Sequence, residues 1–446
     1  MSPFNPHPLP SPYSSRRSLP WAISSLALLA TFAVQADMVV SASSSGSSEQ
    51  QTLTVSLSPN TEDAGKSANL YLAAVAGNQL FAASGTVSNH AWQVVQDTDK
   101  LPDIGTVTFS ANGAMGAGVS IPAFSGIDTR GMAGTTVYAG YGANSQDMLK
   151  GKFALAYTLP AASHANLAYA ASSPAQVLDL YLPAGSGPFP LVINIHGGAF
   201  LGGDKAMLDS AVLARLLAAG YAVATINYRL SGEAVFPAAI QDAKAAVRFL
   251  RANANQYHLD PKRFASFGQS AGGNIAAMLG TTGGSKTSRN GTVIWDDAKL
   301  GNPDVSSVVQ AVVDWFGPTD FAQMDSALSA QGCAASFISH NTAASPESRF
   351  LGIAIGSSGS TALVQDANPI SYVSAATPPF LIEHGSVDCN VPAAQSQLLA
   401  AALSAQGIDN TIQIHQGAGH GMPAESWSGK TSLDRLLAFL DRVLKR

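Results

Sequence analysis

Short, almost continuously apolar segments that alternate with helical patterns are the feature that most limits how residues 177–446 can fold. Segments of this kind are typical of strands buried on both faces of a mostly parallel sheet. The alternation predicts an α/β domain whose parallel strands are joined by right-handed crossovers. Residues 237–250 and 432–444 carry apolar side chains at helical spacing. The predicted strands are 177–182, 191–195, 222–228, 264–267, 309–315, 379–383 and 411–414.

Residues 52–159 show a different pattern, in which about seven short alternating runs are separated by Gly, Asn, Asp and Ser. This pattern predicts a small all-β sandwich domain, for which an immunoglobulin-like arrangement is one option. Linkers are expected on either side, at residues 37–51, which are rich in serine, and at 160–176. His90 and Trp92 fit either a binding surface or, more simply, a surface histidine and a packed ring. We expect the domain to serve attachment, spacing or docking to a surface or polymer.

Residues 1–36 have the composition of a secretory signal peptide, with Arg16-Arg17, an apolar stretch at 21–34 and small residues before Asp37. We expect cleavage after Ala36, export to the periplasm or the medium, and no stable membrane insertion afterwards. An uncleaved membrane anchor is the alternative, although the apolar stretch is short for a span of about 20 residues.

The charge and cysteine content narrow the classes of function. The net charge is -5, only 12% of the residues are charged, and no basic block is present, so we expect no nucleic-acid partner. Neither a CxxC nor an HExxH spacing occurs, so no metal site is predicted. The two cysteines, Cys333 and Cys389, can pair in an exported protein, whereas in a reducing compartment they would stay thiols.

The pentapeptide Gly268-Gln269-Ser270-Ala271-Gly272 lies between the apolar run 264–267 and a helical segment that starts near Asn274. A Gly-x-Ser-x-Gly turn from a strand into a helix is the pattern of a nucleophile elbow. The glycines relieve crowding in the turn, and the helix N-terminus favours developing negative charge beside the serine hydroxyl. Ser270 is therefore the predicted nucleophile. The alternative is a glycine-rich turn that only closes a parallel strand.

A second glycine-rich loop, HGGAF at residues 196–200, follows the strand predicted at 191–195. Acyl transfer needs hydrogen-bond donors aimed at the oxygen that becomes negative, and a loop in this position supplies them in oxyanion holes. A plain glycine-rich turn is again the alternative. The expected donors are the backbone N–H groups of Gly198, Ala199 and Ala271, and the expected supporting residues are His196 and Gly197.

Two further strand ends carry an acid and a base. Asp388 follows the strand predicted at 379–383, and His420 lies in a glycine-flanked loop after 411–414. As general base, His420 would take the proton of Ser270, and Asp388 would orient and stabilise the imidazole. The chain order Ser, Asp, His is the order found in α/β hydrolases.

Other assignments stay open at these positions. Asp388 could instead cap the helix that follows Pro392. His415 is a rival base, but it follows its strand directly and should be less free to point at the serine. His384 ends the strand before the acid and is expected to be structural.

Residues 177–446 resemble α/β-hydrolase serine esterases of the carboxylesterase and hormone-sensitive-lipase-like group, in particular a secreted bacterial feruloyl-esterase-like branch. The resemblance is carried by HGGAF, INYRL, FPAAIQDAKAAVRFLRANA, DPKRFASFGQSAGG, VVDWFGPTDF and HGSVDCNVP. It implies hydrolysis of carboxylic esters through an acyl-enzyme on Ser270, without a cofactor. Ala199 stands where the group usually has a third glycine, but an alanine keeps its N–H group. The N-terminal β domain lies outside the resemblance.

Residues 317–368 interrupt the predicted sheet and are expected to form a lid or an acyl-binding wall. Because Cys333 lies in this excursion and Cys389 directly follows Asp388, a disulfide between them would pin the lid to the loop of the acid. Five apolar residues of the excursion are expected either to line the pocket or to be ordinary core residues: Phe321, Met324, Phe337, Phe350 and Leu351.

Together these features predict an exported serine carboxylesterase that acts on a small-molecule or polymer-borne ester. Acyl or feruloyl esters of polysaccharide and small synthetic esters are the candidate substrates. A serine peptidase of the prolyl-oligopeptidase type shares the fold and the residue order, but about 105 residues of β structure are too few for its usual propeller. A non-catalytic binding protein on a hydrolase scaffold is the other alternative, and the presence of all three triad residues argues against it.

Overall fold

The computed structural model describes residues 38–46, 50–76, 79–97, 100–110, 118–129, 132–288, 291, 295 and 297–445. The predicted signal peptide, residues 1–36, lies outside the described residues. Contacts along the chain divide it into two compact units, the first ending at Ala161 and the second beginning at Ala162. Among the described residues, no helix combines the length and the hydropathy that a membrane span requires.

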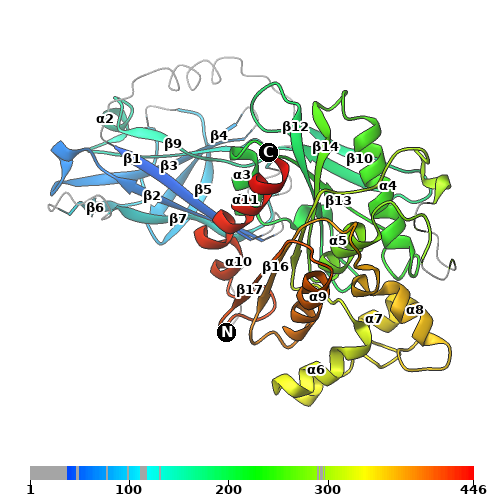
Figure 1. Ribbon diagram of the computed structural model, residues 1–446. Helices are drawn as coiled ribbons and strands as arrows, with labels where there is room; N and C mark the ends of the chain where they lie inside the picture. The colour runs from blue at the N-terminus through cyan, green and yellow to red at the C-terminus, as the bar shows by residue number, and fades with distance from the viewer. Residues whose placement is uncertain are drawn as a thin grey trace. The chain divides into compact units, whose positions relative to one another are not determined.

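The first unit is a sandwich of two antiparallel sheets (Figure 1). One sheet has the order β1-β2-β7 and the other β5-β4-β3-β8-β9, with β6 paired to β3. This order resembles that of immunoglobulin variable-type sandwiches, in which strands A, B, E and D face C″, C′, C, F and G, but here the strand before β7, β6, pairs with β3 of the other sheet. The strands are β1 (Val39–Ser45), β2 (Gln51–Ser58), β3 (Ser67–Ala76), β4 (Gln79–Thr86), β5 (Asn89–Val95), β6 (Thr106–Thr108), β7 (Val119–Ile127), β8 (Thr136–Gly142) and β9 (Phe153–Thr158).

Alternation of apolar and polar residues builds the core of this sandwich. Leu53, Val55 and Leu57 of β2 are fully buried between the sheets and pack in one cluster with Leu70 and Leu72 of β3. Such alternation is what a half-buried strand requires, because successive side chains point to opposite faces. The buried side chains of the two sheets therefore form one continuous hydrophobic core in the first unit.

Two strands contradict the linker predictions. β1 lies inside the predicted serine-rich linker and pairs with β2 along its whole length, and β10 (His164–Ala168) lies inside the predicted linker at 160–176. Both are strands at the edge of their sheets. A sheet edge tolerates serine and other polar side chains on its open side, so composition alone could not separate these strands from linkers.

The second unit is built on an eight-stranded sheet with the order β10-β11-β13-β12-β14-β15-β16-β17. The pairs from β13 to β17 are parallel, and only β11 runs against both of its neighbours. This confirms the predicted α/β-hydrolase sheet. The strands after β10 are β11 (Val177–Tyr181), β12 (Phe189–Ile195), β13 (Ala222–Ile226), β14 (Leu259–Gln269), β15 (Ala311–Trp315), β16 (Phe380–Gly385) and β17 (Asn410–His415).

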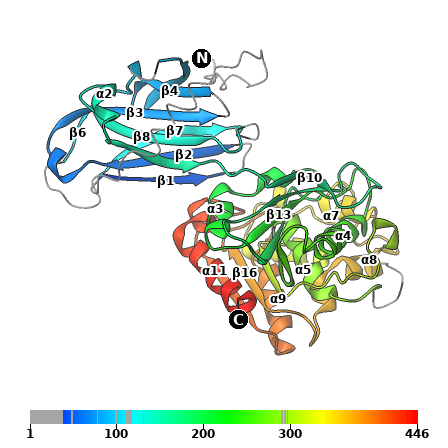
Figure 2. The ribbon, with the colours of Figure 1, turned by 90° about the horizontal axis from the view of Figure 1, so that it is seen from above.

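Helices cover both faces of this sheet, as Figure 2 shows. Successive residues of β12 point to opposite faces of the sheet and pack against different helices. Ile193 belongs to the core cluster that includes residues of α4, α5 and α9, whereas Val192 belongs to the cluster that includes residues of α3 and α11. Every residue of β12 is buried, which explains its continuous apolar run. The helices are α3 (Ser210–Ala218), α4 (Ala238–Ala252), α5 (Ala271–Thr282), α9 (Ala394–Ala405), α10 (Glu425–Ser428) and α11 (Lys430–Leu444).

The strand register brings the carboxyl ends of the central strands to one level. Ile195 of β12 pairs with Gly268 of β14, Gly268 pairs with Asp314 of β15, and Trp315 pairs with Glu383 of β16. Loops that follow these strands therefore emerge at the same edge of the sheet, which is where open α/β sheets place their ligands.

The excursion between β15 and β16 contains only helical segments. Of the five apolar residues expected in it as lid or core, Phe321, Met324, Phe350 and Leu351 are buried, and only Phe337 is exposed (44%). The core interpretation therefore holds for four of the five, because the ring of Phe350 stacks on Phe200 at 4.0 Å between ring centroids. The segments are η5 (Phe321–Gln323), α6 (Met324–Gln331), η6 (Ala335–Phe337), α7 (Pro346–Leu351), α8 (Ser360–Ala367) and η7 (Pro369–Tyr372).

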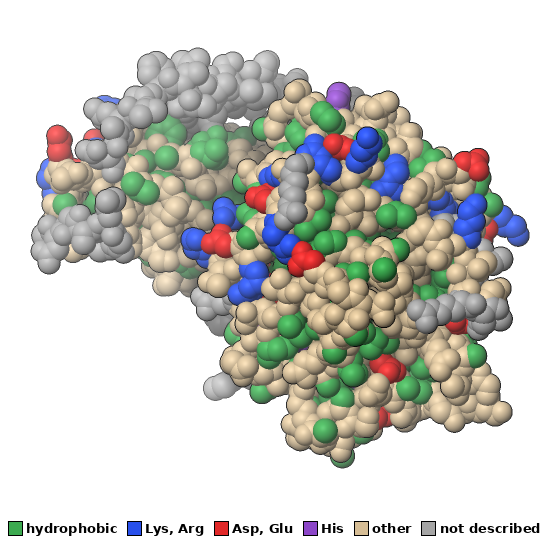
Figure 3. Space-filling view, viewed as in Figure 1, with side chains coloured by type: hydrophobic (Ala, Val, Ile, Leu, Met, Phe, Trp, Pro, Cys, Tyr) green, Lys and Arg blue, Asp and Glu red, His purple; other side chains and the backbone are tan. Residues whose placement is uncertain are grey.

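The charged surface of the second unit is mixed in sign. On the face drawn in Figure 3, acidic and basic side chains lie among one another and are separated by polar and apolar atoms. Interspersed charge of this kind is typical of an ordinary soluble surface rather than of a surface that binds a polyanion.

Candidate active site

Ser270 lies in a sharp turn between β14 and α5. Its backbone has φ 55° and ψ -124°, a strained conformation for a residue with a side chain. A Cβ atom on Gly272 would lie 2.0 Å from the carbonyl oxygen of Ile195, and one on Gly268 would lie 2.0 Å from that of Gly272. Only glycine fits at both positions, so the two glycines of the pentapeptide allow α5 to approach β12 and hold Ser270 in the turn.

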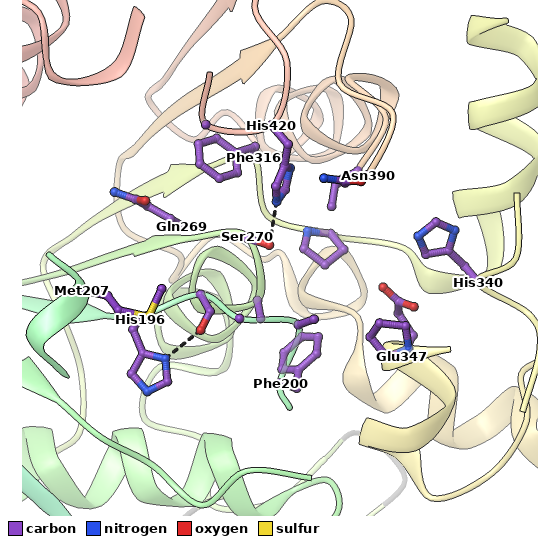
Figure 4. Close-up of a pocket in the computed structure, with 18 of the residues that line it drawn as sticks. His196, Phe200, Met207, Gln269, Ser270, Phe316, His340, Glu347, Asn390 and His420 are labelled. Carbon is purple, nitrogen blue, oxygen red and sulfur yellow. Dashed lines mark hydrogen bonds between the residues drawn. The ribbon is translucent and has the colours of Figure 1, made fainter. Parts of the chain in front are cut away.

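The structure brings Ser270, His420 and Asp388 together from three separate loops. The Nε2 atom of His420 lies 2.9 Å from the Oγ of Ser270, and its Nδ1 lies 2.7 Å from the Oδ2 of Asp388. Figure 4 shows the His420 ring directed at the hydroxyl of Ser270. The edge of the Phe316 ring contacts His420, with 4.7 Å between ring centroids, and limits how far the imidazole can rotate.

Asp388 is held as a buried carboxylate. Its Oδ1 accepts hydrogen bonds from the backbone N–H groups of Asn390 (2.8 Å) and Val391 (3.0 Å). Burial raises the pKa of Asp388, but hydrogen bonds from His384 and His420 outweigh burial and hold this pKa well below its ordinary value. An ionised Asp388 accepts the Nδ1 proton of His420, which leaves Nε2 free to accept a proton from Ser270.

The alternatives for the base and the acid have other contacts. His415 binds Glu383 at 2.6 Å and packs against Trp427, and it makes no hydrogen bond to Ser270. The helix that follows Pro392, α9, begins at Ala394 without a side-chain cap, so Asp388 does not cap it.

His384 has a supporting position that the sequence pattern did not fully indicate. It binds the Oγ of Ser396 through Nδ1 (2.7 Å) and the carbonyl oxygen of Val391 through Nε2 (2.8 Å). The same Nε2 lies 3.4 Å from Oδ2 of Asp388. The expected structural role of His384 is therefore extended by a contact with Asp388. The spacing of four residues between His384 and Asp388 is the sequence signal that could have indicated this contact.

The glycine-rich loop after β12 faces the same pocket as Ser270. Within the described residues, no acceptor is bonded to the backbone N–H groups of Gly198, Ala199 and Ala271. Ala199 has φ 57°, a conformation in which a glycine would be less strained. Three open N–H groups beside a serine hydroxyl are the arrangement that an oxyanion hole requires.

His196 supports this loop from behind. Its ring stacks on Tyr228 with 4.4 Å between ring centroids, and its Nδ1 lies 2.7 Å from the carbonyl oxygen of Gly197. The hydroxyl of Tyr228 donates to the backbone carbonyl of His196. Burial lowers the pKa of His196, and the hydrogen bond to Gly197 opposes that change. A neutral, doubly anchored ring suits a positioning role.

The pocket in front of Ser270 has a volume of about 560 Å³. One side is formed by the glycine-rich loop, the nucleophile turn and the His420 loop. The excursion after β15 provides the opposite wall. Its pocket residues are Phe316, Pro318, Ser336, Phe337, Ser339, His340, Pro346 and Glu347. Four of these side chains are polar and four are apolar, so the wall is less apolar than the expected acyl-binding lid.

A disulfide joins Cys333 and Cys389, as predicted for an oxidising compartment. Beside it, the amide of Gln331 at the end of α6 donates to the carbonyl oxygen of Asp388 at 2.6 Å and accepts from the N–H of Ala393 at 3.1 Å. The excursion and the loop of the acid are thus connected by one covalent bond and two hydrogen bonds. Gln331 was missed by sequence reasoning because nothing in its local pattern distinguishes it.

We expect the double variant Cys333→Ser/Cys389→Ser to lose about 2 to 4 kcal/mol of unfolding free energy, because the disulfide closes a loop between residues 56 positions apart. Urea unfolding of the oxidised wild type and the double variant measures this difference. Reduced wild type is the matched control and should unfold like the variant. Equal midpoints for the oxidised wild type and the variant would show that the bridge contributes nothing to stability.

Asp314, at the end of β15, is a second buried carboxylate near the nucleophile turn. Its Oδ1 accepts from the N–H of Gly317 at 2.9 Å, whereas its Oδ2 has no hydrogen-bond partner among the described residues. Burial raises the pKa of Asp314 from 3.8 to about 6, although the Gly317 N–H group and the charge of His384 oppose the rise. Asp314 therefore keeps its proton to a higher pH in the folded protein than in the unfolded chain.

Because the pKa of Asp314 is higher in the folded protein than in the unfolded chain, its ionisation destabilises the fold as pH rises from about 4 to about 6. We expect the wild type to lose about 3 kcal/mol relative to Asp314→Asn across this window, since asparagine does not titrate. Urea unfolding of both proteins between pH 4 and pH 7 measures the difference. A constant difference at all pH values would contradict the assignment.

The described residues contain no group of three or more His, Cys, Asp or Glu side chains that could hold a metal ion. Asp388 is bonded to His420 and to a backbone N–H group, and Glu383 is bonded to His415.

Three features together define an α/β hydrolase: the order of the sheet, the strained turn at Ser270, and the positions of Ser270, Asp388 and His420 after β14, β16 and β17. A family model described as BD-FAE matches residues 178–403, and the chain belongs to this family. The match confirms the resemblance to α/β-hydrolase esterases that the sequence motifs indicated.

Similar proteins carry esterase names. The chain is 30% identical over 253 residues to "Esterase LipC" of Mycobacterium tuberculosis, which covers 56% of this chain and 57% of that protein. It is 28% identical over 253 residues to a "Probable isoprenylcysteine alpha-carbonyl methylesterase" of Arabidopsis thaliana. This alignment covers 55% of this chain and 48% of that protein. The chain thus spans about half the length of these curated relatives.

Solved structures extend the comparison. A "Truncated form of carbohydrate esterase from gut microbiota" is 34% identical with a TM-score of 0.56, covering 64% of this chain and 96% of that one. A "Bifunctional GH43-CE" of Bacteroides eggerthii is 26% identical with a TM-score of 0.56. This match covers 91% of this chain and 55% of that one. Because residues 162–446 make up less than two thirds of the chain, this second match includes part of the first unit.

Proposed function

We propose that this protein is an exported serine carboxylic ester hydrolase with Ser270 as nucleophile, His420 as general base and Asp388 as the residue that orients the base. The observation that carries the proposal is the continuous hydrogen-bonded chain from the Oγ of Ser270 through His420 to the buried Asp388, at one end of a 560 Å³ pocket. A binding protein would not need this chain of proton acceptors.

In the acylation step, Nε2 of His420 accepts the hydroxyl proton as Oγ of Ser270 attacks the ester carbonyl carbon. The carbonyl oxygen becomes an oxyanion, which accepts hydrogen bonds from the N–H groups of Gly198, Ala199 and Ala271. Each such donor contributes about 3 kcal/mol to the transition state. Collapse of the intermediate breaks the bond to the alcohol oxygen, which takes the proton from His420 and leaves an acyl-enzyme.

In the deacylation step, a water molecule takes the place of the alcohol. His420 accepts a proton from this water, the resulting oxygen attacks the acyl carbon, and Ser270 leaves with the proton returned by His420. The carboxylic acid is then released. Asp388 keeps its negative charge throughout and stabilises the imidazolium that forms in each step.

Carbohydrate-borne acyl groups are the proposed substrate class, with feruloyl esters of polysaccharide among them. The similarity to a structure titled as a carbohydrate esterase supports this class, because the two are 34% identical in an alignment that covers 64% of this chain and 96% of that one. The hydroxyl, imidazole and carboxyl groups of Ser336, Ser339, His340 and Glu347 also give the pocket partners for hydroxyl groups of a substrate. The first unit is a two-sheet sandwich and not a propeller, so the peptidase alternative has no supporting observation.

Export is part of the proposal and rests on residues 1–36 and on the disulfide. A polymeric substrate lies outside the cell, so the enzyme must reach it there. We propose that the sandwich unit serves to hold the enzyme on such a polymer. Protein collected outside the cytoplasm should begin at Asp37, and a chain that keeps its first 36 residues would contradict the proposed cleavage.

Removing the nucleophile tests the mechanism. We expect Ser270→Ala to lower kcat for 4-nitrophenyl acetate by at least about 10⁴-fold, because the oxyanion site alone supplies only residual catalysis. Ser329→Ala, an exposed position on α6, is the matched control and should keep full activity. An acetyl, butyryl, octanoyl and feruloyl ester panel gives the acyl preference. Turnover by Ser270→Ala within tenfold of wild type would exclude the assignment.

A further inference from the structure

The wall of the pocket that faces the catalytic residues contains an acidic side chain with an unusual environment. Figure 4 shows Glu347 and His340 on the opposite side of the pocket from Gln269 and Met207, with the carboxylate of Glu347 directed into the space beside Ser270. Both residues belong to the excursion after β15 and line the same pocket as Ser270. Neither takes part in the mechanism described above.

Glu347 is buried, with only 5% of its surface exposed. One carboxylate oxygen, Oε2, has no hydrogen-bond partner among the described residues. A buried carboxylate oxygen without a partner is costly, because the water it loses on folding is not replaced. Such a group in a substrate pocket is satisfied when a substrate supplies the missing donor.

His340 is fixed beside Glu347 by a separate interaction. Its Nδ1 lies 3.0 Å from Oδ1 of Asp325, and its backbone N–H donates to the same oxygen at 2.8 Å. The Asp325 carboxylate therefore sets the orientation of the ring and leaves Nε2 as the nitrogen that can bond to a substrate. Burial raises the pKa of Glu347, and the charge of His340 opposes that rise.

These groups determine which part of a substrate can occupy this wall. A saturated alkyl chain offers the carboxyl group of Glu347 no hydrogen-bond donor, so it is disfavoured there. A hydroxyl group can donate to this carboxyl group and can also bond to the ring nitrogen of His340. Sites built to bond a substrate hydroxyl reject analogues that lack it, because the buried acceptor is then left unpaired.

We propose that Glu347 and His340 form a subsite for a hydroxyl group of the ester substrate. The proposal rests on the proposed esterase function and names the specificity determinant of the same pocket. A hydroxyl group can come from the sugar on the alcohol side of the ester or from a phenol on the acyl side. Both present the same chemistry to the carboxylate, and the experiment separates them.

Two matched substrate pairs test the subsite. Acetylated xylose and cyclohexyl acetate differ in hydroxyl groups on the alcohol, whereas methyl 4-hydroxycinnamate and methyl cinnamate differ in one hydroxyl on the acyl group. The measured quantity is the ratio of kcat/KM between the members of each pair, for wild type, Glu347→Leu and Glu347→Gln. Glu233→Gln removes an exposed carboxylate outside the pocket and serves as the matched control.

We expect Glu347→Leu to lower the hydroxyl preference at least about tenfold in one pair, the size of a lost hydrogen bond to a charged acceptor. Glu347→Gln keeps an acceptor oxygen and should lose less, and Glu233→Gln should keep the wild-type ratio. A change confined to the first pair identifies the sugar, and one confined to the second identifies the phenol. Changes in both pairs support a hydroxyl subsite that serves either side.

Two outcomes would overturn the subsite: a wild type without hydroxyl preference in both pairs, or ratios that Glu347→Leu leaves unchanged. If the unchanged ratios come with an equal loss of kcat/KM for both members of each pair, Glu347 is purely structural, and thermal unfolding of each variant identifies a folding defect directly. Activity of Ser270→Ala on cyclohexyl acetate is measured alongside. If that variant stays active, the proposed mechanism fails, whereas a failure of the ratios alone removes only the subsite.

Discussion

The close approach of helix α5 to strand β12 is the constraint on which the rest of the site depends. Gly272 places the start of the helix against the carbonyl of Ile195, where any side chain would collide with backbone. That approach forces Ser270 into a left-handed conformation and brings its hydroxyl next to the loop that follows Ile195. One packing contact thus fixes the nucleophile and the candidate anion site together, and it costs backbone strain that the surrounding sheet must offset.

Asp388, the acid of the site, is held in place by a second set of interactions. The loop of Asp388 is joined to the excursion through the Cys333–Cys389 disulfide and through Gln331, and its carboxylate is bonded to two backbone N–H groups. The same excursion provides the pocket wall that contains Glu347 and His340. The orientation of the acid and the shape of the substrate wall are therefore coupled, because a movement of the excursion would move both.

Local patterns predicted the parts of the molecule whose structure is decided locally. Ser270 could be identified because the glycines around it are required by the turn itself, and the buried strands because parallel strands are apolar on both faces. His420 was preferred over His415 because glycines surround it, and only His420 lies within hydrogen-bonding distance of Ser270 in the structure.

Features that depend on long-range packing could not be predicted in the same way. β1 and β10 are strands only because a partner strand pairs with them, so their serine-rich or mixed composition suggested linkers. Phe321 and Phe350 are apolar residues of the excursion and could therefore have lined a lid. In the structure their rings instead pack against Phe200 in the core, which lies more than 100 positions away in the sequence. Glu347 carries no local signal, since its importance comes from being buried without a partner in a pocket.

The central claim is that Ser270 is the activated nucleophile, and covalent labelling tests it most directly. Diisopropyl fluorophosphate reacts with a serine whose proton is taken up by a neighbouring base, and peptide mass mapping locates the adduct. We expect a single adduct on Ser270, with activity lost in proportion to labelling, and slow labelling when Asp388 is replaced by asparagine, because His420 would then adopt the wrong tautomer. Complete inactivation with the adduct on another residue, or full activity with Ser270 labelled, would contradict the account.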